Sequence, residues 1–180
     1  LASGEVAYEN LRAMHWAWLA PTAMRAPDHP AAIATARTGQ LPGGARFDPW
    51  RVAVVEEPTR LPAPGAAPPA RQGVARVERW DSGEVEVTTD SPAQAMLVIS
   101  QRHYPGWTAL LDGQPAPLLR VNGVLQGVEV PSGRHRVRLE FAPAYLPWLS
   151  SLAVIGLIAV LALVASRRAA GRPAPPIHVT

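Results

Sequence analysis

The chain has no cysteine and no lysine, so all 17 of its basic side chains are arginines. Without cysteine there is no disulfide framework, no thiolate zinc site and no catalytic thiol. The five histidines show none of the spacings typical of metal ligands, and no pair lies at i, i+4 on a predicted helix. We therefore expect neither a metal site nor a cofactor; the histidines are His15, His29, His103, His135 and His178.

The excess of positive charge is confined to the C-terminal end. Arg167, Arg168 and Arg172 lie in a stretch with no acidic residue, and residues 1–145 hold 14 arginines against 14 acidic side chains. Binding to a phosphate backbone needs clustered basic surface, which a balanced body does not offer. No nucleic-acid partner is expected.

One long hydrophobic run is present, from Leu146 to Ala165, and it carries no charge. As a helix it covers about 30 Å, the hydrocarbon thickness of a bilayer, so we predict a transmembrane helix at 146–166. A buried core helix is the alternative interpretation. Tyr145 and Trp148 suit one membrane interface, and the arginine cluster suits the cytoplasmic side.

This orientation places residues 1–145 outside the cytoplasm and leaves 167–180 as a cytoplasmic tail. Residues 1–20 lack the basic and apolar regions of a signal peptide. We therefore expect translocating spans before Leu1, in a longer parent protein.

Five prolines at 58–72 predict an extended linker between two parts of the body. Residues 1–57 read as a small α/β segment. Strands are expected at Trp16–Ala20 and Trp50–Glu57. Between them Asp28 is a helix N-cap, Pro30 lies in the first turn, and Gly39 ends the helix.

Residues 73–143 have a β pattern throughout. Apolar and polar residues alternate strictly in Glu84–Thr89 and His135–Phe141, and Asp112-Gly113 and Asn122-Gly123 are hairpin signals. About seven strands at this spacing predict an antiparallel β-sandwich. The predicted fold is thus mainly β, with an α/β N-terminal segment and one C-terminal membrane helix. Further strands are expected at Ala95–Tyr104, Trp107–Asp112, Leu118–Val121 and Leu125–Val130.

The segment His103 to Pro143 resembles the C-terminal part of the YfhO family of bacterial membrane proteins. The family pattern begins with Tyr-Pro-Gly-Trp, found here at Tyr104–Trp107, and continues with an Asp-Gly turn at Asp112-Gly113 and an Asn at Asn122. It then has Val-x-Val-Pro-x-Gly at Val128–Gly133, His-x-Val at His135–Val137 and a final aromatic-x-Pro at Phe141–Pro143. YENLRAMHWAWLA and FDPWRVAVVEE resemble upstream stretches of the family. The first match is looser, because Met14, His15 and Trp16 replace Leu-Pro-Arg.

The resemblance implies a polytopic protein of the bacterial cell membrane, similar to the GT-C glycosyltransferases. Such enzymes move a sugar from a polyprenyl-phosphate donor to a cell-envelope polymer such as teichoic acid. Their catalytic acidic residue lies in a loop of the membrane bundle, here before Leu1, so none is carried over onto this chain. The chain would be non-catalytic by itself, with an accessory or acceptor-side role, and its partners would be the bilayer and the upstream helices of the parent.

Two other functions are kept open. A membrane-anchored binding or scaffold module without enzymatic activity is the main alternative. A soluble secreted sandwich would require the 146–165 segment to be a core helix.

Five side chains are candidates for binding substrate: Trp16, Trp18, Trp107, Asn122 and Arg136. Trp16 and Trp18 would share one face of a strand, with Arg12 and Arg46 nearby, as an acceptor-binding surface. Trp107 could stack on a sugar ring or belong to the core. Asn122 could bind a sugar or serve a turn, and Arg136, beside Arg134 and Arg138, could meet phosphate or pair with Glu84, Glu86 or Glu129.

For Asp112 and His135 the sequence favours a structural role over a catalytic one. Asp112 suits the turn with Gly113, since aspartate tolerates positive φ. His135 suits a strand edge beside a turn.

Overall fold

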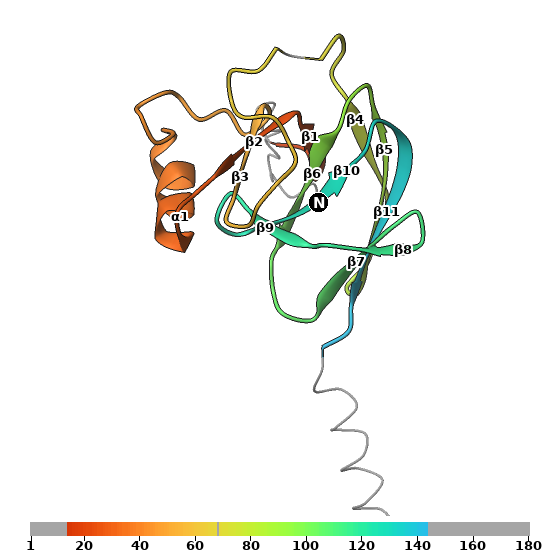
Figure 1. Cartoon of the computed structure of the whole chain (residues 1–180). Helices are drawn as coiled ribbons and strands as arrows, with labels where there is room; N and C mark the ends of the chain where they lie inside the picture. Colours follow the sequence, from red (N-terminus) through yellow and green to blue (C-terminus); the bar gives the residue numbers. More distant parts are fainter. Residues whose placement is uncertain (1–13, 68, 144–180) are drawn as a thin grey trace, which may run out of the picture. The chain divides into compact units, whose positions relative to one another are not determined.

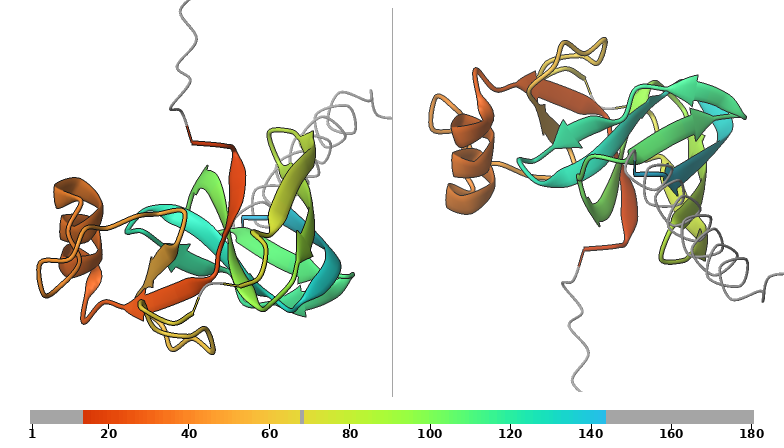
Figure 2. Two further views of the ribbon diagram at one scale, coloured as in Figure 1. Left: turned by 90° about the horizontal axis from the view of Figure 1, so that it is seen from above. Right: turned by 90° about the horizontal axis from the view of Figure 1, so that it is seen from below.

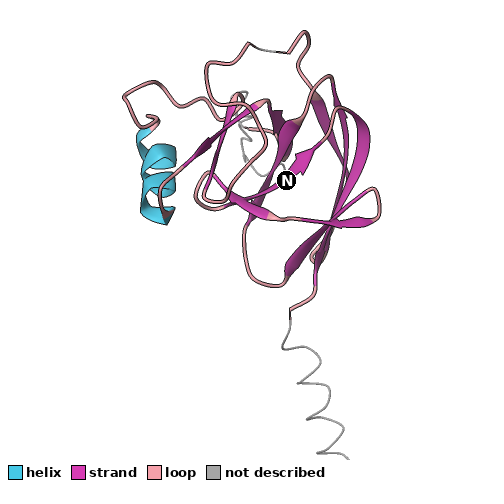
Figure 3. Ribbon diagram, viewed as in Figure 1, coloured by secondary structure: helices cyan, strands magenta, loops and turns pink. Residues whose placement is uncertain are grey.

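The computed structural model describes residues 14–67 and 69–143, and strands dominate them (Figures 1 and 3). A single helix, α1 (His29–Thr38), accompanies eleven strands in this part of the chain. The mainly β prediction is confirmed. The strands are β1 (Ala17–Ala20), β2 (Thr22–Arg25), β3 (Val52–Val55), β4 (Val74–Trp80), β5 (Glu84–Ser91), β6 (Ala95–Arg102), β7 (Trp107–Leu111), β8 (Gln114–Ala116), β9 (Leu119–Val121), β10 (Leu125–Val130) and β11 (Gly133–Phe141).

The strands form two sheets. One has six strands in the order β1-β6-β10-β9-β3-β2, and the other has five in the order β4-β5-β11-β7-β8. Neighbours are antiparallel except β2 and β3, which run parallel. A parallel pair needs a crossover connection, and here the crossover contains α1.

The main core lies between the two sheets. It combines Leu97 and Val128 of the six-stranded sheet with Val87, Val137 and Leu139 of the five-stranded sheet, all fully buried. In β5 burial alternates residue by residue, because one face of that strand meets the core and the other meets solvent. The alternation in these strands predicts that Val85, Val87, Val137, Leu139 and Phe141 face inward; the first four are buried, and Phe141 at the end of its strand is half-buried.

The six-stranded sheet is covered on its second face as well. Trp18, Met96 and Val98 pack there with Leu61, which comes from the proline-rich segment. Beside them α1 packs on β3 through Ala32 and Val54. Figures 1 and 2 show α1 on the opposite side of this sheet from β4, β5 and β11.

The helix matches its prediction at both ends. The Asp28 carboxylate accepts a hydrogen bond from the Ala31 N–H at 2.8 Å, and Pro30 lies in the first turn. Gly39 adopts φ 69° and donates its N–H to the Thr35 carbonyl, which ends the helix.

The segments on either side of 58–72 share one sheet. β1 pairs with β6, and β3 pairs with β9, so the two-layered arrangement is not confined to 73–143 as predicted. Residues 58–67 and 69–72 contain no strand or helix, and Pro62 lies beside this sheet, because the Ala23 N–H donates a hydrogen bond to its carbonyl. The described residues up to Phe141 form a single compact unit.

No helix in residues 14–67 and 69–143 has the length and apolar character needed to cross a bilayer. The predicted transmembrane helix at 146–166 and the tail at 167–180 lie outside the described residues, as does Arg12.

Candidate functional site

An open cleft of about 1000 Å³ lies between β1 and β4, which are the end strands of their respective sheets. We call it the aromatic cleft. Its lining combines aromatic rings with polar and charged side chains, and includes His15, Trp16, Trp18, Asp48, Trp50, Arg51, Gln72 and Arg76. Gly73 allows the close approach of the two edges, because a Cβ there would lie 2.6 Å from Leu19 Cδ1.

Three rings form one side of the cleft. Trp50 lies between Trp18 and His15, with ring-centroid distances of 5.7 and 5.4 Å. Trp18 is only 4% exposed and its Nε1 donates to the Pro49 carbonyl at 2.8 Å. Trp18 therefore fixes the 48–51 turn against β1, whereas Trp50 and His15 provide the more accessible ring surface.

A second aromatic pair joins the edges of the two sheets. Trp16 is 64% exposed and its ring lies 4.8 Å from that of Trp80. A β-bulge between Val77 and Arg79 makes this pair possible. Before the bulge the odd-numbered residues of β4 face the core, and the extra residue turns Trp80 to that side, where it meets Trp16.

The polar side chains of the cleft are available to a ligand. Neither Arg51 nor Arg76 forms an ion pair with another residue of the described ranges. Asp48 accepts a hydrogen bond from the Trp50 N–H, which holds the turn that carries both Trp50 and Arg51. Flat apolar rings beside donors and acceptors suit a ligand with one apolar and one hydroxylated face.

A second open cleft, of about 600 Å³, lies over the outer face of the five-stranded sheet, where Asp112 and His135 meet. Asp112 Oδ2 lies 2.7 Å from His135 Nδ1, and Asp112 Oδ1 accepts from the Arg136 N–H. The other ring nitrogen of His135 faces the Ser132 carbonyl at 3.2 Å. Both nitrogens are thus occupied, so this pair fastens the Asp112-Gly113 turn to β11 and leaves no ring nitrogen free to act as a base.

Hydrogen bonding shifts the pKa values of both Asp112 and His135. The Asp112 carboxylate raises the pKa of His135 above its usual 6.5, and the Arg136 N–H, followed by His135, lowers the pKa of Asp112. A raised histidine pKa adds stability that is fully present below pH 6.5 and is lost as the pH rises through the raised value.

We expect His135→Gln to remove part of the pH dependence of stability. The wild-type chain should gain free energy of unfolding relative to the variant as the pH falls from about 8 to 6, because only the wild type binds the extra proton in its folded state. The measurement is urea unfolding of both proteins over this range. Parallel pH profiles would contradict the role assigned to the Asp112–His135 pair.

The five predicted binding residues are not brought together. Trp16 and Trp18 line the aromatic cleft, but Trp18 is buried, so the pair does not present one exposed face. Trp107 is half-buried and packs on Phe141, with ring centroids 5.3 Å apart. Arg46 lies beside a neighbouring cleft that shares Asp48 and Trp50.

Asn122 and Arg136 have intramolecular partners. Asn122 is buried, and its Oδ1 accepts from the Val54 N–H at 2.9 Å. Arg136 pairs with Glu86 at 2.9 Å, and Arg138 pairs with Glu84 at 2.8 Å, as the cross-strand interpretation predicted. The Glu129 carboxylate instead accepts hydrogen bonds from the Thr59 hydroxyl and the Arg60 N–H.

Sequence reasoning did not select His15, Trp80, Arg51, Gln72 or Arg76. Trp80 follows the alternating Val74–Val77 stretch out of phase, which is the only trace of the bulge in the sequence. In the described part of the chain, no three His, Asp or Glu side chains lie together in a way that could hold a metal ion.

Comparison with known families gives a match over the C-terminal part of the chain. The model of the bacterial membrane protein YfhO matches residues 69–152. This segment matches the YfhO family. The match begins at the end of the proline-rich segment and takes in β4 to β11 of the YfhO segment, with one wall of the aromatic cleft. No curated protein and no solved structure matches the chain.

Proposed function

We propose that the chain is the extracytoplasmic, acceptor-side domain of a YfhO-family membrane glycosyltransferase. The parent would transfer a sugar from a polyprenyl-phosphate donor to a cell-envelope polymer. The domain would bind the acceptor without taking part in the chemistry, and the observation that carries this role is the aromatic cleft between β1 and β4.

The chemistry of the cleft supports a glycan ligand. A sugar ring has a C–H face that packs on an aromatic ring and hydroxyl groups that bond to polar side chains. Trp16 and Trp50 offer the rings, and Gln72, Arg51 and Asp48 offer donors and acceptors within the same cleft. Polar groups arranged around apolar rings are the usual composition of a small-molecule site.

The sequence supports the location. Residues 69–152 match a family described as bacterial membrane proteins, and the match includes the start of the uncharged run at Leu146. Arginines follow that run, which favours a cytoplasmic C-terminus and an extracytoplasmic position for residues 1–145.

Trp16→Ala tests the cleft. Because Trp16 is largely exposed, its removal should leave the fold intact and weaken binding of extracted cell-envelope polymer about tenfold, or about 1.4 kcal/mol. The matched control is Tyr104→Ala, which removes another exposed aromatic ring outside the cleft. Binding would be measured by calorimetry on the full chain in detergent.

Equal binding by the wild type, Trp16→Ala and Tyr104→Ala would refute the proposed acceptor site. Sugar transfer by membranes that contain the parent protein distinguishes the alternative function. A parent that binds polymer through the cleft but transfers no sugar would be a membrane-anchored binding or scaffold module.

A further inference from the structure

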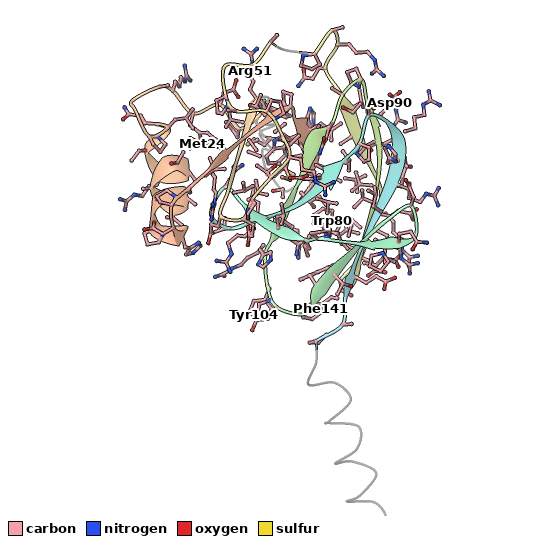
Figure 4. The ribbon with its side chains drawn as sticks, viewed as in Figure 1. Met24, Arg51, Trp80, Asp90, Tyr104 and Phe141 are labelled. Carbon is pink, nitrogen blue, oxygen red and sulfur yellow. The ribbon has the colours of Figure 1, made fainter. Side chains whose placement is uncertain are left out.

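One end of the domain carries an aromatic patch formed by Tyr104, Trp107 and Phe141. Tyr104 lies in the turn between β6 and β7 and is 57% exposed. Trp107 begins β7, Phe141 ends β11, and the two are paired in the sheet with their rings in contact. Figure 4 shows Tyr104 and Phe141 at the same end of the domain and Asp90 near the other.

The aromatic patch lies close in the chain to the predicted transmembrane segment. Phe141 is the last strand residue, and the uncharged run begins at Leu146. Five residues span at most about 18 Å even when fully extended. If Leu146 enters the hydrocarbon, Phe141 lies within that distance of it, and the headgroup layer between them is about 5 to 8 Å thick.

The groups around the patch suit a lipid headgroup layer. Tyrosine and tryptophan have an apolar body and a polar tip, and they are enriched at membrane–water interfaces. Arg102, the last residue of β6, is exposed next to this turn. Glu84 and Glu140 at the same end both pair with Arg138, and Glu84 also pairs with Arg79, so arginine side chains offset part of the negative charge that opposes approach to anionic lipid.

We propose that Tyr104, Trp107 and Phe141 form a membrane-docking surface that rests in the lipid headgroup layer. The partner is the bilayer surface itself. Docking at this end would fix the tilt of the domain, and it would hold the aromatic cleft at a constant height above the membrane. The inference rests on the transmembrane segment of the proposed function, but not on glycan binding.

Cysteine labelling tests the proposal, because the natural chain has no cysteine to remove. A nitroxide would be attached at Tyr104→Cys in the full chain, reconstituted in vesicles of phosphatidylcholine and phosphatidylglycerol. The matched control is Val74→Cys, since Val74 is 54% exposed and pairs with Asp90 at the opposite end. A third label at Val160→Cys reports on the predicted span.

We expect relaxation by a water-soluble nickel complex to be several-fold weaker at position 104 than at position 74, and relaxation by oxygen to be stronger. Equal water exposure at 104 and 74, with a protected label at 160, would overturn docking and leave the span intact. Water exposure at all three positions would overturn the membrane topology as well. A circular dichroism spectrum of each labelled chain verifies that it is folded.

Discussion

Asn122→Ala is expected to lower the free energy of unfolding by about 2–4 kcal/mol, although Asn122 was a candidate for sugar binding. Two costs combine. Asn122 has φ 52°, a left-handed conformation that asparagine tolerates and alanine does not. Its Oδ1 also accepts the buried Val54 N–H, which would be left without a partner in the variant. Urea unfolding followed by tryptophan fluorescence measures the loss.

Asn122→Gly separates the two costs. Glycine removes the backbone strain but still leaves the Val54 N–H unpaired, so this variant should lose less stability than Asn122→Ala. Unchanged stability in Asn122→Ala, together with weaker polymer binding, would restore Asn122 as a ligand residue.

Gly127→Ala is expected to destabilise the domain by about 1–3 kcal/mol through overpacking. A Cβ on Gly127 would lie 2.3 Å from Val121 Cγ2 and 3.0 Å from the Met96 sulfur. Val121 and Met96 are fully buried, so they cannot move away from the added methyl group without disturbing β9 and β6. Denaturant unfolding of the full chain checks this value.

Gly83→Ala is the matched control for added volume. Nothing lies within 4 Å of the position that its Cβ would occupy, so its stability should change by less than about 0.5 kcal/mol. Similar losses at positions 83 and 127 would show that the loss at Gly127 does not come from overpacking against Val121 and Met96.

Local signals in the sequence predicted local structure well. The helix from His29 to Thr38 follows from its cap residues, because Asp28 and Gly39 satisfy backbone groups within a few residues of themselves. The Asp112-Gly113 hairpin likewise follows from two residues that adopt positive φ, with Leu111 and Gln114 paired across the turn.

The pairing of strands that are distant in the chain could not be predicted from the sequence. Proline content correctly indicated an irregular segment at 58–72, but composition carries no record of which strands pair across it. The pairing of β1 with β6 depends on complementary burial of both faces, and a strand buried on both faces has no alternating pattern that identifies its neighbour. β2 was not predicted, since Thr22–Arg25 is too short to show a period.

The same limit applies to the candidate site. Periodicity placed Trp16 and Trp18 on one face, yet only the three-dimensional structure shows that Trp18 is sealed by the 48–51 turn. Of the three acidic side chains that the sequence offered as partners for the arginines of β11, Glu86 pairs with Arg136 and Glu84 pairs with Arg138, whereas Glu129 pairs with neither. The bulge that directs Trp80 to Trp16 is a one-residue irregularity, and it decides the shape of the cleft edge.

The interleaved six-stranded sheet also determines when the domain can fold. Ala17 pairs with Ile99 and Val55 pairs with Val121, so the sheet is built from contacts that are very distant in the chain. Contacts of this kind slow folding toward the millisecond-to-second range. During synthesis β1 stays without its partner until β6 has emerged, and β3 has only β2 beside it until β9 has emerged. Folding of the domain and emergence of the hydrophobic run at Leu146 therefore fall almost together in time.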